Sequence, residues 1–141
     1  MKNLIQSFVV TLTIISTFLI GNAACSSTKT APVQGQWEQL GTRTVNFGLD
    51  RDEISVTARE GFFTALKLKV DRSALNMHKM VIHFGDGSTQ DVELKGNFKA
   101  GQESRVIDLA GNRRVITKVV FWYDTKNIRK TRAIVELWGR H

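Results

Sequence analysis

The chain has 141 residues, a length typical of a single domain. Its 20 Lys and Arg against 13 Asp and Glu give a net charge of +7, which favours anionic partners such as lipid head groups, acidic glycans or nucleic acid, although a modest net charge also serves solubility alone. Because Cys25 is the only cysteine, an internal disulfide is excluded.

The N-terminal segment has the pattern of a secretory signal peptide. Lys2 is the only charged residue among the first 25, and every residue of Phe8–Ile20 is apolar or carries a small hydroxyl group. Small residues, which are typical of the region before a cleavage site, follow at Gly21–Ala24. We expect residues 1–24 to be removed, which would lower the net charge from +7 to +6, and export argues against nucleic acid as a partner. The alternative is an uncleaved membrane anchor, because the uncharged stretch 3–28 is long enough to span a bilayer.

Cys25 directly follows Ala23 and Ala24 at the end of the apolar run. This arrangement resembles the lipobox of bacterial lipoproteins, whose cysteine is diacylated and becomes the new N-terminus, although Asn22 replaces the usual aliphatic residue. The alternative is ordinary cleavage after one of the two alanines. Residues 25–36 are rich in Ser, Thr, Gln and Gly and are expected to form a flexible tether. We expect an exported protein that is periplasmic, anchored to the outer membrane through Cys25, or secreted.

From Trp37 onward apolar and polar residues alternate with a period of two, the pattern of half-buried β-strands. The clearest alternating stretches are residues 54–58, 66–70, 80–84, 115–123 and 133–138. Turn residues separate them, and Gly-Asp-Gly-Ser at 85–88 predicts a hairpin. A total of about eight strands predicts an all-β antiparallel sandwich over residues 37–141. We expect jelly-roll-like topology, because the Cys…Trp…Cys pattern of immunoglobulin domains is absent.

Two of these stretches predict their place in a sheet. Residues 115–123 are apolar on both faces, with Thr117 on one side and Ile116 on the other, so we expect a central strand. Residues 66–70 carry Lys67 and Lys69 on their outward face, which predicts either a face in water or a sheet edge.

Four stretches together resemble a family of small exported bacterial β-sandwich proteins of unknown function. They are WEQLGTRTVNFGLDRDEISV, GFFTALKLKV, SRVIDLAGNRRVITKVVFWYDT and RAIVELWG, which lie within residues 37–139. The resemblance implies the fold and the export of the chain. It implies no activity and no catalytic residues.

The stretch SRVIDLAGNRR at 104–114 places charged residues within an apolar run, where a buried charge needs a partner. We expect Asp108 to form a structural ion pair with Arg105, Arg113 or Arg114, and Asp108→Ala to lower stability by a few kcal/mol if the pair is buried. The alternative is an arginine pocket for a carboxylate or phosphate, because the guanidinium fork matches both anions.

No metal site or cofactor is expected. His78 and His83 would point to opposite faces of one strand, and no zinc-binding spacing occurs. Asp50, Asp52 and Glu53 form an acidic run interrupted by an arginine, which favours a solvated turn with a local ion pair over a calcium site with six or more oxygen ligands.

Aromatic and basic residues provide two further candidate surfaces. Trp122 and Trp138 could stack on a glycan, although packing in the core is the simpler interpretation. A basic loop at 125–132 could bind anionic lipid or glycan of the cell envelope, together with Lys67, Lys69 and Lys118, or simply be solvated. The basic residues of this loop are Lys126, Arg129, Lys130 and Arg132.

The sequence contains no G-x-S-x-G, P-loop or GxGxxG motif, and no cysteine lies in the folded part. We therefore expect a non-catalytic envelope module that binds or organises an envelope component, with no catalytic residues. The alternative is a small envelope hydrolase, or an inhibitor of one, with Asp50 and Asp52 near a cleft.

Overall fold

The computed structural model describes residues 33–45, 51–124 and 131–141, all within one compact unit, Ala31–His141. No helix within these ranges is long and apolar enough to cross a membrane. The predicted signal peptide, the first part of the predicted tether and several candidate residues lie outside the described residues. These candidates are Cys25, Asp50, Lys126, Arg129 and Lys130.

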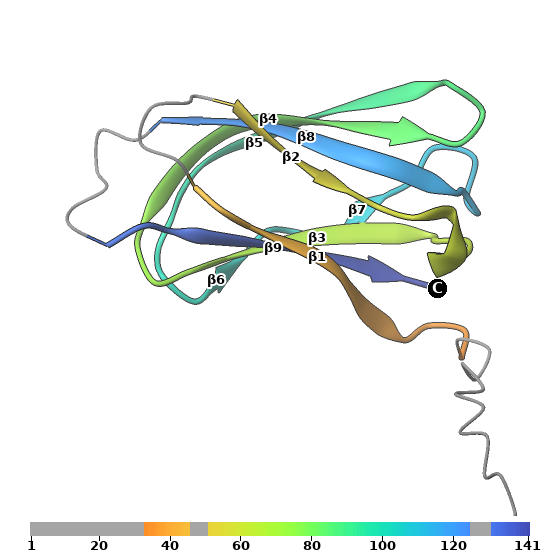
Figure 1. The fold of residues 1–141 in the computed structure, drawn as a ribbon, viewed down its shortest axis with the longest axis horizontal. Helices are drawn as coiled ribbons and strands as arrows, with labels where there is room; N and C mark the ends of the chain where they lie inside the picture. The colour runs from red at the N-terminus through yellow and green to blue at the C-terminus, as the bar shows by residue number, and fades with distance from the viewer. Residues whose placement is uncertain (1–32, 46–50, 125–130) are drawn as a thin grey trace, which may run out of the picture. The chain divides into compact units, whose positions relative to one another are not determined.

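The described ranges contain nine strands and one short 3-10 helix, η1, at Ala58–Glu60. The strands are β1 Trp37–Thr44, β2 Arg51–Ser55, β3 Ala65–Asp71, β4 Leu75–Phe84, β5 Thr89–Phe98, β6 Gln102–Glu103, β7 Ile107–Asp108, β8 Ile116–Asp124 and β9 Ile134–Arg140 (Figure 1). The predicted hairpin at 85–88 joins β4 to β5.

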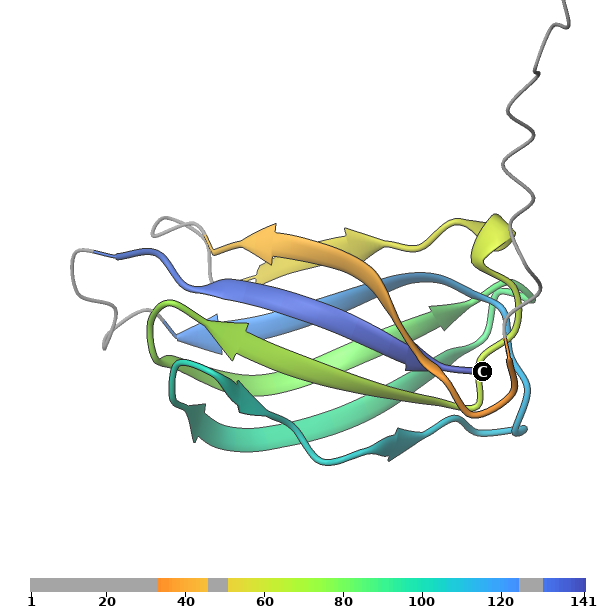
Figure 2. The same ribbon diagram turned by 90° about the horizontal axis from the view of Figure 1, so that it is seen from below.

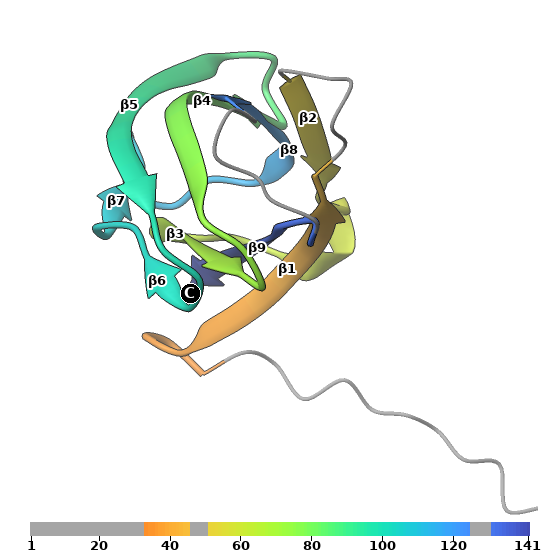
Figure 3. The same cartoon turned by 90° about the vertical axis from the view of Figure 1, so that its left-hand side faces the viewer.

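The strands form two antiparallel sheets that face each other across the core (Figure 3). One has the order β1-β9-β3-β6, with β7 also paired to β3, and the other has the order β2-β8-β4-β5. The first strand thus pairs with the last, β2 with β8, β3 with both β6 and β7, and β4 with β5. This is the pairing of one long antiparallel hairpin rolled into two sheets, which confirms the predicted jelly-roll topology.

The core lies between the sheets and follows the predicted alternation. In β3, Leu66, Leu68 and Val70 are buried while the two lysines between them are partly exposed. Both β3 and β8 lie inside their sheets, so β8 is central as predicted and β3 has one outward face rather than an edge position.

Two β-bulges change the faces that the sequence predicts. A register shift between His83 and Phe84 reverses the start of β8, so Ile116 is buried in the core and Thr117 is exposed. A second shift, at His78, leaves His78 exposed between two buried methionines. Since a bulge adds a residue and resets the period-two alternation, the one at His78 places His78 and His83 both on the outer face rather than on opposite faces.

Polar bridges join the edge strands of the two sheets. Arg43 of β1 donates from Nε to Oδ1 of Asp52 in β2 at 2.8 Å, and the Tyr123 hydroxyl donates to Oδ2 at 2.8 Å. On the other side, Nε2 of Gln90 in β5 donates to the carbonyl of Asp108 at 3.0 Å. Each bridge thus links the two sheets along one side of the sandwich.

The chain enters and leaves the sandwich at one end, which contains Gly35, η1, the turn 85–88 and His141 and is here called the tether end (Figures 1 and 2). The Gly35 amide donates to the His141 carbonyl at 2.7 Å. The His141 ring lies 2.8 Å from the Glu38 carboxylate and 3.0 Å from the carbonyl oxygen of Phe62. The opposite end, with the turns at 72–74 and 99–101, is called the far end.

Candidate functional site

An open pocket of about 510 Å³ lies at the tether end, between η1 and the turn that joins β4 to β5. It is lined by Ala58, Phe62, Gly85, Asp86, Arg113, Arg114, Val115 and Thr117. The lining therefore combines apolar side chains with two arginines and one carboxylate.

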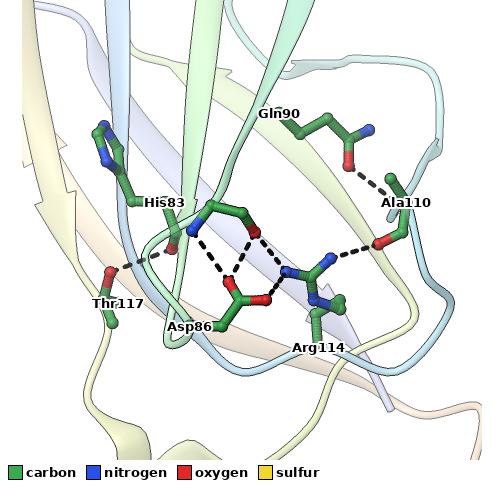
Figure 4. Close-up of polar contacts among 7 residues, drawn as sticks. His83, Asp86, Gln90, Ala110, Arg114 and Thr117 are labelled. Atoms are coloured by element: carbon green, nitrogen blue, oxygen red, sulfur yellow. Dashed lines mark hydrogen bonds and ion pairs between the residues drawn. The ribbon is translucent and has the colours of Figure 1, made fainter.

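One wall of the pocket is a hydrogen-bonded network around Arg114 (Figure 4). Nη2 of Arg114 donates to Oδ2 of Asp86 at 2.7 Å and to Oγ of Ser88 at 2.6 Å, and Nη1 donates to the carbonyl of Ala110 at 2.9 Å. The guanidinium also lies 3.9 Å from the centre of the Phe84 ring. Arg114 therefore ties the β4–β5 turn to the loop before β8, and its charge is already balanced.

Asp86 is ionised more readily than an ordinary aspartate. The Ser88 hydroxyl, which donates to Oδ1 at 2.6 Å, contributes most to lowering the pKa of Asp86. The Ser88 amide and the Arg114 guanidinium act in the same direction. The carboxylate is therefore held in its charged form by the turn itself.

The second wall is formed by Phe62 and Arg113. Phe63 is fully buried and pairs with Arg114 in an isolated bridge, so its neighbour Phe62 points outward and is 52% exposed. The guanidinium carbon of Arg113 lies 5.2 Å from the centre of the Phe62 ring, within the range of a cation–π contact. Within the described part of the chain, Arg113 has no carboxylate partner.

These two walls differ in what they can bind. The guanidinium of Arg114 already donates to Asp86, Ser88 and Ala110. The guanidinium of Arg113 remains available to a ligand beside the exposed Phe62 ring. A planar fork with several donors matches carboxylate and phosphate oxygens. The pocket can therefore hold an anionic group whose apolar part rests against Phe62 and Val115, in line with the arginine-pocket alternative.

The predicted ion pair of Asp108 has a different partner. The Asp108 side chain is 84% exposed, and its Oδ1 lies 3.5 Å from Nη2 of Arg140 in β9. Arg105 instead donates to the carbonyl of Glu93 at 3.4 Å. The two-residue strand β7 buries Ile107 and turns Asp108 outward, which explains why this charge is not buried. Of the predicted set, only Arg113 and Arg114 meet at the pocket.

The predicted tryptophan pair is divided between the two outer faces. Trp122 lies on the outer face of β8, with the guanidinium carbon of Arg51 at 5.6 Å and Nζ of Lys79 at 4.5 Å from its ring centre. Trp138 lies on the outer face of β9 and donates from Nε1 to Glu136 at 3.0 Å. They neither form one stacking platform nor belong to the core cluster, because both occupy outward positions of their strands.

The predicted basic surface is also divided. Lys67 and Lys69 lie on the outer face of β3, where they pair with Glu103 at 2.9 Å and Asp71 at 2.7 Å. Lys118 belongs to the other sheet and lies 3.5 Å from Glu53. Arg132, the one described basic residue of the 125–132 loop, is exposed.

The pair formed by Lys69 and Asp71 is electrostatically linked. Their hydrogen bond raises the pKa of Lys69 and lowers the pKa of Asp71, so both groups stay charged. The two charges thus neutralise each other on the outer face of β3. Among the residues that the structure describes, no group of three or more His, Cys, Asp or Glu could hold a metal ion.

Two features of the structure were missed by the sequence analysis. Phe62 was not singled out, and Asp52 was placed in a solvated turn, although it is buried in β2. A signal for Asp52 does exist, since it shares the period-two face of Ile54 and Val56, both of which are buried.

Comparison with protein families finds a match to the model described as Domain of unknown function (DUF2541), over residues 8–139. The match reaches further towards the N-terminus than residues 37–139, where the resemblance was expected. Comparisons with the curated proteins and with the solved structures find no match.

Proposed function

We propose that this chain, which belongs to the DUF2541 family of domains of unknown function, is a non-catalytic module of the cell envelope that binds an anionic group at the pocket beside Phe62. The observation that carries the proposal is Arg113. Its guanidinium stacks on an exposed aromatic ring at the mouth of a pocket and pairs with no carboxylate of the described residues. Such a group is available to a carboxylate or phosphate ligand.

The cell envelope is proposed from the N-terminal sequence. The apolar run 8–20, the small-residue exit and the position of Cys25 together favour export with lipidation. The positive net charge of the rest of the chain suits the anionic lipids and glycans found at such surfaces.

The alternative hydrolase receives no support from Asp52. Its carboxylate accepts hydrogen bonds from Arg43 and Tyr123, and its side chain is only 2% exposed. A carboxylate held in this way serves stability, and it does not line the pocket. Asp50, the second acid of that alternative, lies outside the described residues.

A titration with inorganic phosphate tests the pocket. The amide and arginine side-chain signals of the ¹⁵N-labelled mature chain would be followed by NMR at low ionic strength. We expect shifts at Phe62 and Arg113, with loss of binding in Arg113→Gln and partial retention in Arg113→Lys, because lysine keeps the charge but not the fork. Arg105→Gln, which removes an exposed arginine outside the pocket, is the matched control.

Equal binding by the wild type and Arg113→Gln would contradict the proposal. So would phosphate-dependent shifts that appear only at Arg105 or elsewhere outside the pocket. Melting curves of each variant would show that the fold is kept, which is expected because the Arg113 side chain is exposed.

A further inference from the structure

We infer that the tether end is a membrane-docking surface: Arg113 and Arg59 bind phosphate head groups of an anionic bilayer, and Phe62 enters the interface. This inference rests on the proposed function and names the source of the anion as a lipid head group. It concerns one end of the sandwich, not its outer sheet faces.

Exposed apolar side chains gather at this end. Three large hydrophobic residues of the described chain are exposed, and two of them, Val33 at 59% and Phe62 at 52%, lie at the tether end. Both belong to segments that are bonded to His141, since Gln36 donates to the Val33 carbonyl and accepts from the His141 amide, and the His141 ring lies 3.0 Å from the Phe62 carbonyl. An exposed aromatic ring beside a cation, as Phe62 lies beside Arg113, is typical of an interaction surface.

The charges at the tether end favour an anionic surface. Arg59 in η1 and Arg113 are exposed, and neither has an ion pair with any described residue. The acids there are in contact with groups of the protein: Asp86 with Arg114 at 2.7 Å, Glu38 with the His141 ring at 2.8 Å, Glu60 with the Thr57 hydroxyl at 3.1 Å and the exposed Asp108 with Arg140 at 3.5 Å. The cations that remain open therefore face outward beside Phe62, as required for binding to phosphate head groups.

The length of chain before the domain favours the same end. Gly35 and Gln36 are bonded to His141, so only residues 26–32 separate Cys25 from the described domain; as the flexible tether expected from the sequence, they would span on average about 15 Å and at most about 25 Å. The far end is separated from the tether end by roughly the length of the ten-residue strand β4, about 33 Å. A lipid on Cys25 would thus keep the tether end at the bilayer without stretching, whereas contact by the far end would need a span longer than the fully extended linker.

The far end is the competing surface. It includes Arg132, and the basic residues Lys126, Arg129 and Lys130 belong to the same loop of the sequence. The two ends can be distinguished because the chain has only one cysteine, so Cys25→Ser provides a cysteine-free background for site-specific labels.

The experiment uses the mature chain from residue 25 with Cys25→Ser, a nitroxide label at Ala58→Cys or Ala100→Cys, and phosphatidylglycerol or phosphatidylcholine vesicles. Ala58 lines the pocket at the tether end, and Ala100 lies in the exposed far-end turn 99–101. We expect binding to phosphatidylglycerol vesicles only, with the label at residue 58 shielded from a water-soluble relaxation agent. The label at residue 100 should remain accessible.

Variants test the named residues by vesicle sedimentation. Arg59→Gln and Arg113→Gln are each expected to weaken partitioning by about fivefold, the factor that corresponds to one basic residue near an anionic surface. Phe62→Ala should weaken it as well, and 1 M salt should abolish most of it, since the Debye length falls to about 3 Å. Lys99→Gln, which removes an exposed far-end cation, should have no effect.

Shielding of the label at residue 100 instead of residue 58 would overturn the inference in favour of the far end. Phosphate binding at Arg113 without vesicle binding would overturn the lipid assignment and leave the proposed anion site in place. Failure of both phosphate and vesicles to bind would overturn the inference and the proposed function together.

Discussion

Replacing Arg43 by methionine should destabilise the sandwich more than replacing an exposed arginine, such as Arg51, whose partner is also exposed. The Arg43 guanidinium is half exposed, at 50%, but its partner Asp52 is buried, with a side chain that is 2% exposed. After the substitution, the carboxylate would keep only the hydrogen bond from Tyr123. A buried charge would then lie at the edge of the core with one donor.

The magnitude follows from the burial of the two partners. Removing one partner of a fully buried ion pair costs about 3–5 kcal/mol. Because Arg43 is partly solvated, the lower part of that range applies, and we expect a loss of about 3 kcal/mol. For a domain of this size, that loss corresponds to a decrease in Tm of about 12 °C. Tyr123→Phe removes one hydrogen bond to a charged acceptor and should cost about 1.5–3 kcal/mol.

Urea unfolding followed by tryptophan fluorescence measures these losses. Arg51→Met is the matched control, because Arg51 lies on the neighbouring strand, is 53% exposed and approaches Glu53 only to 3.8 Å; its loss should cost less than about 1 kcal/mol. The double variant with Arg43→Met and Asp52→Asn should be more stable than Arg43→Met alone, because the buried charge is gone. A cost for Arg43→Met equal to that of Arg51→Met, or no recovery in the double variant, would refute this reasoning.

Four further predictions follow from other parts of the structure. Gly139→Ala should lower the free energy of unfolding by about 1–3 kcal/mol, because the added Cβ would lie 2.6 Å from Cδ1 of Phe63; an unchanged urea midpoint would show that the ring can move aside. Asp108→Ala should change the free energy of unfolding by less than about 1 kcal/mol, since the carboxylate is 84% exposed, and a larger loss would point to a buried role. Because the folded-state pKa of Asp86 is lowered, its stabilising contribution is present above the usual unfolded pKa of about 3.9 and is lost as the pH falls through the folded value. The Tm difference between wild type and Asp86→Asn should therefore be constant from pH 5 to 7 and shrink in acid. A Tm difference that grows in acid would contradict the lowered pKa. Intact mass spectrometry of the membrane fraction should find a diacylglyceryl increment that Cys25→Ser abolishes, whereas an unmodified mass would make the protein a free exported domain.

The strand faces could be predicted from the sequence because one side of each sheet is buried. The alternation in β3 places Leu66 and Leu68 in the core and Lys67 outside, as the structure confirms. The bulge that exchanges the faces of Ile116 and Thr117 could not be predicted, because the position of an extra residue depends on the pairing with the neighbouring strand. The hydrophobic pattern of β8 alone does not mark that position.

The candidate site was predicted only in part. Arg113 and Arg114 were expected to pair with Asp108, with an arginine pocket as the alternative. Phe62 is distant in the sequence and meets them only because Phe63 pairs with Arg114. Asp108 was expected to be buried because it lies in an apolar run. Burial alternates along this run, with Ile107 and Leu109 in the core, so Asp108 occupies an outward position and its carboxylate reaches solvent.

The position of β9 determines when the chain can fold. β9 lies between β1 and β3, and β1 has no other strand partner within the described residues. The first sheet therefore cannot be completed until Ile134–Arg140 has been synthesised, although β3 can already pair with β6 and β7. Pairings between such distant segments fold slowly compared with local contacts. With this topology, β1 stays without its strand partner until the last strand has been synthesised.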